Sequence, residues 1–300
     1  MREAHQTCKR NCHNRCTARC YSSQLVVQRI EQRPSYHDDL IKRGILVKGS
    51  LGSGSYSKVK KAVDVYANFA KIAIKIIDKC HATKDYLDRF LPRELSIWIR
   101  LCHPNLIKLI DFFEENMRVY MVIEYAPGGD ALNYIQKKGP LDETQAKSWL
   151  NQIINALSYM HSRNVAHRDL KLENLLLFDN CTRIKLCDFG FVKHIQPNNC
   201  LSDTFCGSKA YAAPEILSGQ AYDPKKGDVW ALGVVLFIII TGKMPFNETR
   251  GIKNVLEEQA ALNLGEINTC FEKIILQAFT WNVALRPDID SLQLDPWIED

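Results

Sequence analysis

The sequence lacks the features of a membrane, secreted or nucleic-acid-binding protein. Its longest apolar run, residues 229–240, falls short of the roughly 20 residues that cross a bilayer, so we expect a buried helix and no membrane partner. Residues 1–20 are charged and have no apolar core of the kind a signal peptide needs, which predicts an intracellular, cytoplasmic protein. A formal net charge of +5 on 300 residues is too small to favour nucleic acid as a partner.

Cysteine is not scarce, but it does not predict disulfides. A cytoplasmic chain of 300 residues can bury enough core to fold without them. Four cysteines recur every four residues in the polar, basic start of the chain: Cys8, Cys12, Cys16 and Cys20. Zinc sites usually separate two close cysteine pairs by a dozen or more residues, unlike this pattern. We therefore interpret residues 1–44 as a disordered basic arm, and a zinc or redox role for its thiols stays open.

The apolar pattern changes at Ile45 and again at the break near residues 127–129. Before the break, strands are predicted at 58–65, 72–77 and 118–125. A helix is predicted at 85–101, with Pro92 near its boundary. After the break, apolar residues at helical spacing predict a helix at 144–160. These patterns predict an α+β fold with two lobes, a strand-rich one at 45–125 and a helical one at 126–298.

The stretch LGSGSYSKV at residues 51–59 is typical of a turn that lets backbone approach phosphate. Alone it is a weak indication, because paired glycines are common in hairpins, and Ser57 stands where a third glycine would be expected. The apolar stretch IAIK at 72–75 strengthens it, since Lys75 in a buried strand needs an anionic partner. Phosphate or a carboxylate would serve.

Two further stretches carry polar groups between apolar residues. HRDLKLEN at 167–174 contains Asp169, Lys171 and Asn174, and a buried loop with so many polar groups predicts a binding role. DFG at 188–190 places Asp188 at the end of a short apolar strand. Acid, amide and lysine together form a set that suits Mg²⁺ and phosphate.

The ordered motifs GxG, IAIK, HRD, DFG and APE resemble those of the eukaryotic protein kinases. The similarity covers residues 45–298 and implies a bilobal fold, with a small antiparallel-sheet N-lobe that contains one main helix and a large, mainly helical C-lobe. It also implies transfer of the γ-phosphate of ATP to hydroxyl groups of protein substrates, with ATP and Mg²⁺ as cofactors.

The resemblance implies a role for each catalytic residue. Lys75 would hold the α- and β-phosphates and pair with Glu94. Asn174 and Asp188 would bind magnesium, and Asp169 would accept the proton of the incoming hydroxyl.

The resemblance also implies the nucleotide site. Apolar side chains would enclose the base and backbone groups would read its edge, with Ile123 as the residue at the rear of the pocket. The residues expected to bind nucleotide are Leu51, Gly52, Ser53, Gly54, Ser55, Tyr56, Ser57, Lys58, Val59, Ala73, Lys75, Glu124, Ala126 and Leu176. We expect Ser57 to be tolerated, because the third glycine position lies on the outer side of the hairpin.

Other residues concern regulation and the type of acceptor. Within HRDLK, Lys171 would neutralise the moving phosphoryl group and marks a serine/threonine kinase. Thr204 stands where an activating phosphate often falls, with Arg168 and Lys193 as candidate basic partners. The alternative is that Thr204 is a solvated loop hydroxyl. An upstream activating kinase or autophosphorylation in trans would add that phosphate. Cys206 lies beside it, and whether this thiol is redox-sensitive stays open.

Three residues are expected at the substrate side. Ser208 would bond toward Asp169 and Lys171. Asp130 and Glu173 stand where kinases that prefer basic sequences keep acids, so an arginine upstream of the acceptor would be favoured. The alternative is that Asp130 contacts only the ATP ribose and Glu173 is solvated.

Scaffold contacts and a closer family are also expected. Glu215 would pair with Arg286, and Asp228 would orient the catalytic loop. The stretches at 85–94, 188–191 and 204–215 are similar to those of the testis-specific serine/threonine kinases, which implies a role in spermatogenesis or sperm function. Rival interpretations are a catalytically silent pseudokinase scaffold and a kinase of small molecules. The motifs disfavour both, because Lys75 and the acids are in place and the segment ending in APE is typical of a platform for protein substrates.

Overall fold

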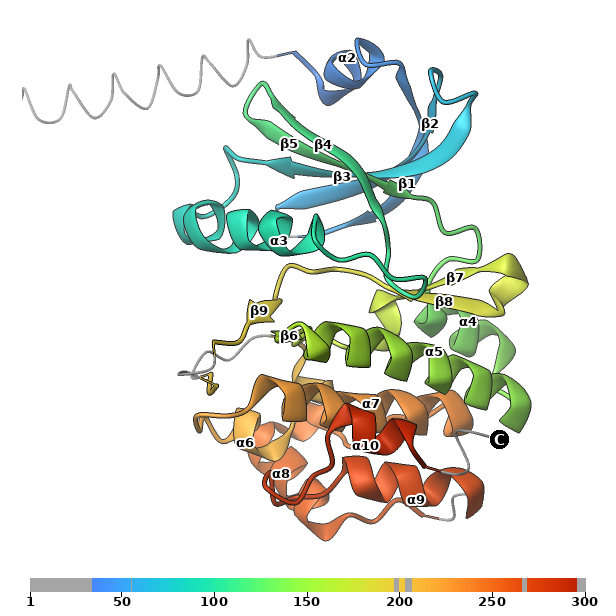
Figure 1. Ribbon diagram of the computed structural model, residues 1–300, viewed down its shortest axis with the longest axis vertical. Coiled ribbons are helices and arrows are strands. Elements are labelled where there is room, and N and C mark those ends of the chain that lie inside the picture. Colours follow the sequence, from blue (N-terminus) through green and yellow to red (C-terminus); the bar gives the residue numbers. More distant parts are fainter. Residues whose placement is uncertain (1–33, 55, 197–199, 203–206, 266–268, 296–300) are drawn as a thin grey trace, which may run out of the picture. The chain divides into compact units, whose positions relative to one another are not determined.

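The computed structural model describes residues 34–54, 56–196, 200–202, 207–265 and 269–295 (Figure 1). Their contacts divide the chain into two compact units. The first comprises the described residues up to Thr83 together with Asp111–Val122, and the second comprises Lys84–Ile110 and the chain from Ile123 onward.

The first unit contains most of a five-stranded sheet in the order β1-β2-β3-β5-β4; residues 109–110 and 123–124, at the ends of two strands, belong to the second unit. Its strands are β1 (Ile45–Ser53), β2 (Ser57–Asp64), β3 (Ala70–Asp78), β4 (Leu109–Glu115) and β5 (Arg118–Glu124). The strands predicted at 58–65, 72–77 and 118–125 are therefore confirmed. Because side chains alternate along a strand, Ile72, Ile74 and Ile76 share one face of β3 and are buried, while Ala73 and Lys75 lie on the other.

Helix α2 (Tyr36–Ile41) corrects the prediction of a disordered arm up to residue 44. Leu40 is fully buried in one cluster with Ile74 and Tyr120, which stabilises the unit by about 1.5–3 kcal/mol. The helix is too short for its apolar residues to repeat, so periodicity cannot reveal it. The capping box of this helix is a sequence signal that could have revealed it, since the side chains of Ser35 and Asp38 each accept the backbone N–H of the other residue.

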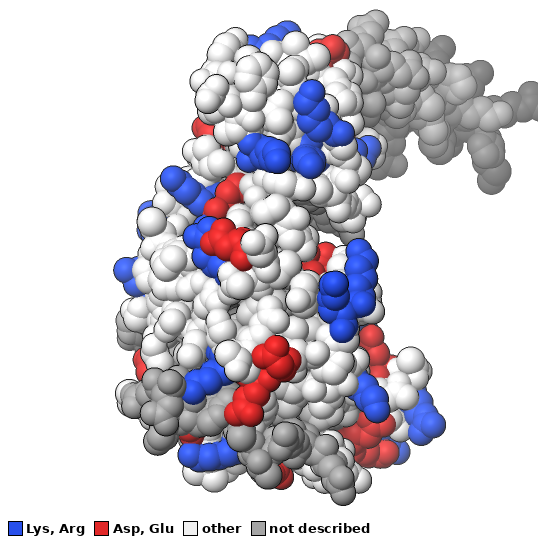
Figure 2. All heavy atoms as spheres, turned by 90° about the vertical axis from the view of Figure 1, so that its right-hand side faces the viewer, with Lys and Arg blue, Asp and Glu red and all other residues white. Residues whose placement is uncertain are grey.

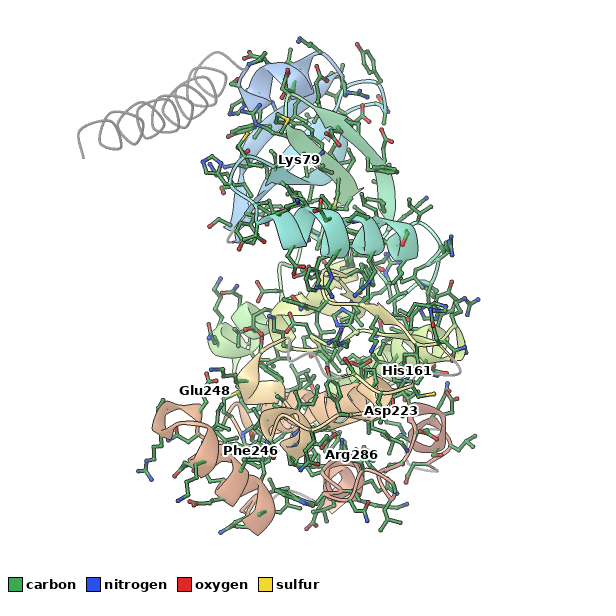
Figure 3. The ribbon with its side chains drawn as sticks, turned by 90° about the vertical axis from the view of Figure 1, so that its left-hand side faces the viewer. Lys79, His161, Asp223, Phe246, Glu248 and Arg286 are labelled. Atoms are coloured by element: carbon green, nitrogen blue, oxygen red, sulfur yellow. The ribbon has the colours of Figure 1, made fainter. Side chains whose placement is uncertain are left out.

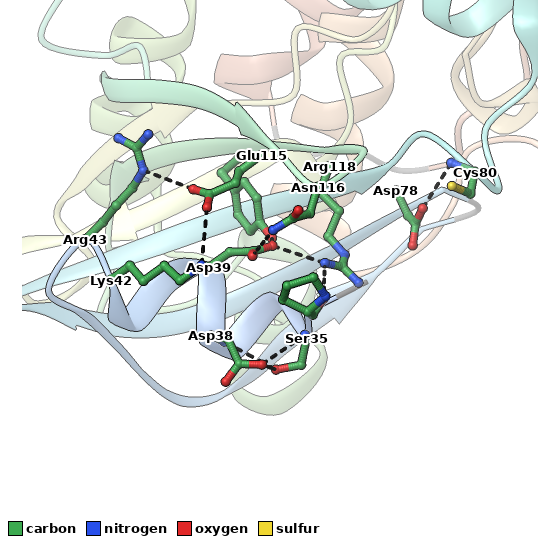
Figure 4. Close-up of polar contacts among 12 residues, drawn as sticks. Ser35, Asp38, Asp39, Lys42, Arg43, Asp78, Cys80, Glu115, Asn116 and Arg118 are labelled. Atoms are coloured by element: carbon green, nitrogen blue, oxygen red, sulfur yellow. Dashed lines mark hydrogen bonds and ion pairs between the residues drawn. The ribbon is translucent and has the colours of Figure 1, made fainter. Parts of the chain in front are cut away.

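A buried polar network anchors α2 to the sheet (Figure 4). The carboxylate of Asp39 is fully buried and accepts hydrogen bonds from Asn116 Nδ2 at 2.6 Å, Arg118 Nη1 at 3.1 Å and the Tyr120 hydroxyl. Burial and the hydrogen bond to Asp39 raise the pKa of Tyr120. Residues that the sequence assigned to an arm therefore complete the first unit.

The second unit is mainly helical. Its helices are α3 (Leu91–Trp98), α4 (Ala131–Lys138), α5 (Glu143–Ser162), α6 (Pro214–Leu217), α7 (Pro224–Thr241), α8 (Ile252–Ala261), α9 (Thr269–Ala278) and α10 (Ile289–Gln293). The predicted helices at 85–101 and 144–160 are confirmed, and a π-helical turn (Tyr86–Phe90) leads into α3. By its contacts α3 belongs to the second unit, whereas the sequence placed it within the lobe at 45–125.

Helix α7 confirms that the long apolar run is a core helix. Asp223 caps its start, Gly242 ends it in the left-handed conformation, and residues 227–239 are all buried. Trp230 on this helix packs against Phe246 and Phe279, and the guanidinium of Arg286 lies 5.0 Å from its ring centre. Figure 3 labels Phe246 and Arg286 among the helices of this unit. No helix among the described residues is long and apolar enough to cross a membrane.

Short strands and turns hold the loops of the second unit. The strands pair as β6 (Val165–Ala166) with β9 (Lys193–His194) and β7 (Leu175–Phe178) with β8 (Arg183–Leu186). The 3₁₀ turns are Leu172–Asn174, Asp179–Cys181, Lys209–Tyr211 and Glu248–Arg250. On the face shown in Figure 2, basic and acidic side chains are interspersed, in keeping with the small net charge.

Candidate active site

Helix α7 holds the loop that follows β6 through the side chain of Asp228. Asp228 Oδ2 accepts the backbone N–H of His167 at 2.8 Å, and Oδ1 accepts that of Arg168 at 2.8 Å. His161 Nε2 lies 2.9 Å from the same carboxylate. The predicted contacts of Asp228 with this loop are therefore present.

The ionised form of Asp228 is favoured although the side chain is buried. Burial by itself raises the pKa of a carboxyl group, but the hydrogen bond from His161, the charges of His161 and His167 and the N–H of Arg168 outweigh it. The pKa of Asp228 therefore lies below its ordinary value. A buried carboxylate with this many partners gives the loop one fixed geometry.

The hydrogen bonds of His167 define its tautomer. In the neutral ring, Nε2 lies 3.0 Å from the carbonyl oxygen of Cys187 and acts as the donor, because a carbonyl can only accept. Its Nδ1 is then the acceptor for the backbone N–H of Asp169 at 3.3 Å. The imidazole thus links the Asp169 loop to the strand end that precedes Asp188.

Asp169 lies at the centre of a polar cluster. Lys171 Nζ contacts Asp169 Oδ2 at 2.8 Å and donates to Ser208 Oγ at 3.0 Å. Ser208 in turn donates from its backbone N at 3.1 Å and its hydroxyl at 3.2 Å to Asp169 Oδ1. The contacts predicted for Ser208 are therefore present. Asn174 Nδ2 donates to Asp169 Oδ2 at 3.1 Å and to its carbonyl at 2.8 Å.

The turn at residues 188–190 follows β8. Asp188 has a left-handed backbone with φ of +64°, a strained geometry for a residue other than glycine that is common at functional sites. Phe189 is fully buried, with its ring centre 5.0 Å from that of Trp98 and 5.9 Å from that of His167. A Cβ on Gly190 would lie 3.3 Å from Asp188 Oδ1 and 3.8 Å from Glu94 Oε2, so both carboxylates flank this turn.

The donor set suits magnesium. The amide nitrogen of Asn174 is bonded to Asp169, which leaves its side-chain oxygen as a hard ligand, and the backbone oxygen of Asn174 accepts from the N–H of Cys187, the residue before Asp188, at 2.8 Å. No group of three or more His, Cys, Asp or Glu able to hold a metal occurs among the described residues. One acid and one amide are what an ion needs when phosphates and water supply its remaining ligands.

The residues predicted to bind nucleotide lie on both units. In the first unit, the hairpin of β1 and β2 closes with Gly54 N donating to Ser57 O at 2.8 Å, and Val59 pairs with Lys75 across β2 and β3. The other predicted residues of this unit are Leu51, Gly52, Ser53, Tyr56, Lys58 and Ala73, while Ser55 lies outside the described residues.

In the second unit, Ile123 is buried, and Ala126 and Leu176 are partly exposed. The carboxylate of Glu124 is bonded to Lys185 Nζ at 2.7 Å through both oxygens, so only its backbone is available to a base. Lys75 belongs to the first unit and Glu94 to the second, and their predicted ion pair stays a prediction.

The two acids predicted to bind the substrate, Asp130 and Glu173, differ in their hydrogen-bond partners and exposure. Asp130 caps α4, and its carboxylate accepts from Asn133 N at 2.8 Å and Asn133 Nδ2 at 2.6 Å. Glu173 is exposed and accepts a hydrogen bond from the Tyr211 hydroxyl at 3.4 Å. Burial, and then the charge of Glu173, raise the pKa of Tyr211.

Sequence reasoning missed Tyr222, which pairs with Ser202, two residues before Thr204. The hydroxyl of Tyr222 accepts from Arg168 Nε at 3.3 Å and Nη2 at 3.1 Å. The backbone of Tyr222 pairs with that of Ser202 in both directions, at 2.8 and 2.9 Å. No motif marks this tyrosine. Thr204, Cys206 and the cysteines at 8–20 lie outside the described residues, so their predicted roles stay predictions.

An aspartate held between a lysine and an amide, on a loop that helix α7 fixes, is an arrangement that suits phosphoryl transfer. The protein kinase domain family matches residues 45–298 of the chain. The testis-specific serine/threonine-protein kinase 3 of Mus musculus is 40% identical over 267 residues, which cover 87% of this chain and 98% of the relative. The testis-specific serine/threonine-protein kinase 1 of Homo sapiens is 45% identical over 225 residues, 73% of this chain and 60% of the relative.

The testis-specific serine/threonine-protein kinase 4 of Homo sapiens is 36% identical over 291 residues, 91% of this chain and 88% of the relative. The chain belongs to the protein kinase family and, within it, to the testis-specific serine/threonine kinases. Its first unit carries most of the five-stranded sheet and its second the helices of that fold. It is a protein serine/threonine kinase, which uses ATP to phosphorylate protein substrates.

Proposed function

We propose that Asp169 accepts the proton of a serine or threonine hydroxyl while Lys171 neutralises the phosphoryl group transferred to it. The cluster around Asp169 carries this proposal. Lys171 and Ser208 fix the two carboxylate oxygens, and Asn174 binds the side chain and the backbone of Asp169 together. A carboxylate held from three sides keeps one orientation, which is what positioning the acceptor hydroxyl requires.

In this proposal, the other predicted residues bind the nucleotide and its metal ion. Lys75 binds the α- and β-phosphates of ATP and Glu94 fixes this lysine. Asn174 and Asp188 hold Mg²⁺, which neutralises charge on the β- and γ-phosphates when it is bound. Transfer then depends on position and on charge stabilisation, with little covalent chemistry left to the protein.

We further propose that the substrate carries a basic residue upstream of the acceptor. Glu173 supports this, because the residue is exposed and lies in the turn that follows Asp169, whereas both oxygens of Asp130 already accept hydrogen bonds from Asn133. The variant Glu173→Ala should raise KM for a peptide with an upstream arginine several-fold and leave KM for a neutral peptide unchanged. An equal change in KM for both peptides would contradict the proposed preference for an upstream basic residue.

Phosphorylation of Thr204 is proposed as the activating event. Arg168 supports it, because its guanidinium is bonded to Tyr222, which pairs with Ser202 two residues before Thr204, and a guanidinium is a strong phosphate partner. An upstream kinase or another copy of the chain would be the donor. Phosphopeptide mapping of the purified protein with and without Lys75→Met separates the two, since only self-modification disappears in the variant.

A role in spermatogenesis or sperm function is proposed from the names of the relatives, which are testis-specific kinases. The cytoplasmic location stays a prediction. Both can be checked by staining germ cells at successive stages with an antibody against the chain. Signal confined to somatic tissue would contradict the role.

The central test uses Lys75→Met and Asp169→Asn, with Lys79→Met as the matched control. Lys79 pairs with Glu114 on the same unit and is assigned no part in transfer. We expect both site variants to lose labelled-phosphate transfer to a serine peptide by at least 100-fold, with Tm unchanged, and the control to keep it.

The wild-type chain and the Asp169→Asn variant also test the pseudokinase alternative. Magnesium-dependent thermal stabilisation by ATP without any transfer in the wild-type chain would show a scaffold. Stabilisation together with transfer that Asp169→Asn abolishes would show the kinase proposed above.

A further inference from the structure

A cavity of about 400 Å³ lies within the first unit. Its lining includes Lys58 of β2, Ile76 of β3, Arg118 of β5 and Tyr36 of α2. Cavities of ~300–1,000 Å³ are typical of sites for small ligands. None of the steps proposed for phosphoryl transfer uses this cavity.

The cavity and Lys75 lie on opposite faces of the sheet. Lys58 pairs with Ile76 across β2 and β3, and the next pair is Val59 with Lys75. Because directly paired residues share a face and successive residues alternate, Lys58 lies with Ile76, and Val59 lies with Lys75. Ile76 belongs to the buried cluster that contains Leu40 of α2. The cavity is therefore on the face that α2 covers, away from the lysine predicted to hold the nucleotide phosphates.

Arg118 is a buried cation in this lining. Only 8% of the residue is exposed, and its Nη1 donates to Pro34 O at 2.8 Å and to Asp39 Oδ2 at 3.1 Å (Figure 4). A guanidinium carries five N–H groups in a fixed fork, and these two bonds use one of its three nitrogens. The contacts that hold α2 thus fix a cation at the cavity and do not involve Nε or Nη2.

Lys58 supplies a second cation from another strand. The residue is exposed, and its ammonium group has no hydrogen bond or ion pair with any described residue. Lys60 lies on the same face two residues later, with its Nζ 5.9 Å from the ring centre of Tyr36. Cations from β2 and β5 therefore flank the cavity.

Asp78 is the one acid among the described residues of the lining. Its Oδ2 lies 3.3 Å from Nδ1 of His81, which also lines the cavity. A protonated imidazole would offset this carboxylate, whereas Lys58 has no acid beside it in the described chain. The balance of charge favours an anionic ligand.

We propose that this cavity is a second ligand site, which binds a phosphate monoester carried on an apolar or aromatic body. Lys58 and Arg118 hold the phosphate from two strands, because charge-assisted bonds to phosphate are strong and the guanidinium fork matches its oxygens. The half-buried ring of Tyr36 and the side chain of Ile76 contact the body of the ligand. A small phosphate ester and a phosphorylated side chain of a polypeptide share this chemistry.

Calorimetric titration of the full chain with phenyl phosphate tests the site, with Lys71→Ala as the matched control for Lys58→Ala. Both lysines are exposed on the same sheet, but Lys71 stands four positions before Lys75 on β3 and shares its face. We expect Lys58→Ala to raise the Kd of phenyl phosphate about tenfold and Lys71→Ala to raise it less than about twofold. An equal change in both variants, or no saturable binding to the wild type, would overturn the proposal.

The sign of the charge gives a second test. Asp78→Asn removes the acid of the lining and should lower the Kd of phenyl phosphate by about threefold, because a repulsion is lost. Damage to the fold would only weaken binding, so a gain in affinity is specific to an anion in this cavity. An unchanged or higher Kd in this variant would show that the phosphate binds elsewhere.

Lys75→Met separates the cavity from the nucleotide site. Phenyl phosphate should bind this variant with a Kd within about twofold of the wild type, because Lys75 lies on the other face of the sheet. Loss of binding would place the probe at the nucleotide site and overturn the proposal. Lys58 is itself among the residues expected at the nucleotide, so its variant is judged by the Kd of the probe and not by transfer. A wild-type chain that binds the probe but transfers no phosphate to a serine peptide would contradict the proposed function alone.

A short phosphotyrosine peptide distinguishes the two sources of the phosphate. A Kd about tenfold lower than that of phenyl phosphate would identify a phosphorylated polypeptide as the ligand, and equal Kd values would identify a small phosphate ester. The unphosphorylated peptide is the control. If it bound as tightly as the phosphorylated one, the cavity would not recognise phosphate and the proposal would fail.

Discussion

The backbone of Gly207 runs so close to that of Arg168 that a Cβ atom on Gly207 would lie 2.5 Å from the Arg168 carbonyl oxygen. The same atom would lie 3.2 Å from Asp169 Oδ1. Gly207 also has φ of +87°, a conformation that other residues rarely adopt. The backbone at Gly207 can therefore approach Arg168 and Asp169 this closely only because this position has no side chain.

We predict that Gly207→Ala lowers kcat by roughly 100-fold, because the displaced segment moves Ser208 and Asp169 out of position. It should also cost more than about 1 kcal/mol of stability, since alanine is strained at positive φ. Steady-state kinetics and urea unfolding measure the two effects.

Gly219→Ala is the control for this prediction. Gly219 has φ of +69°, but a Cβ there would meet nothing within 4 Å. The control should show the backbone strain in its unfolding midpoint and normal kcat. If Gly207→Ala behaved in the same way, the close approach to Arg168 would have no catalytic consequence.

The low pKa of Asp228 predicts how stability depends on pH. A carboxyl group whose pKa is depressed in the folded state stabilises it above the unfolded value of about 3.9, and this contribution is lost as pH falls through the folded pKa. We expect the contribution of Asp228 to be constant between pH 7 and 5 and to decline below about pH 4.

Denaturant unfolding from pH 7 to pH 3 checks this expectation. Asp228→Asn should be less stable at pH 7 and should show a shallower fall in the free energy of unfolding below pH 4. A variant that lost stability with pH as steeply as the wild type would place the titrating group elsewhere.

The network of Asp39 predicts that the N-terminal helix is required for stability. Asp39→Ala leaves Arg118 buried without its carboxylate, which should cost about 3–5 kcal/mol of unfolding free energy. Asp38→Ala, on the exposed side of α2, should shift the unfolding midpoint much less. The double variant Asp39→Ala with Arg118→Met should regain part of the loss, because no charge is then left unpaired. An equal loss in the single and double variants would mean that the charge on Arg118 is not the cause.

The parts of the fold that the sequence predicted are those with a local pattern. The strands around Lys75 and helix α5 repeat their apolar residues at the period of the element, so burial can be read along the chain. Helix α7 is instead a continuous apolar run whose length predicts a buried helix. Asp169, Lys171 and Asn174 stand within one short loop, and their contacts follow from the turn itself. Ser208 and Asp228 needed the resemblance to the kinases, which supplied pairings across long stretches of chain.

The contacts that the sequence did not predict join distant residues without a motif. Asp39 and Arg118 are one example, because a single acid in a short polar helix resembles a solvated charge until the fold buries it. Tyr222 and Arg168 are another, since an isolated tyrosine before a helix has no distinguishing neighbour. Such pairs depend on which elements the fold brings together, and one sequence carries no record of that choice.

The ion pair of Glu215 and Arg286 was expected from the sequence and leads to the last prediction. Arg286 Nη1 and Nη2 donate to the two oxygens of Glu215 at 2.7 and 3.0 Å, and Arg286 Nε donates to the carbonyl of Thr280 at 3.0 Å. The guanidinium is fully buried and its fork matches the carboxylate, which an ammonium cannot reproduce.

Arg286→Lys should therefore destabilise the chain by about 2 kcal/mol although the charge is kept, and Glu215→Ala by about 3–5 kcal/mol, because the buried guanidinium loses its partner. Urea unfolding measures both. Lys253→Ala breaks an exposed pair with Glu257 at 3.9 Å and should cost less than about 0.5 kcal/mol. If Arg286→Lys were as stable as this control, the two-pronged geometry would contribute nothing, and the pair would act through charge alone.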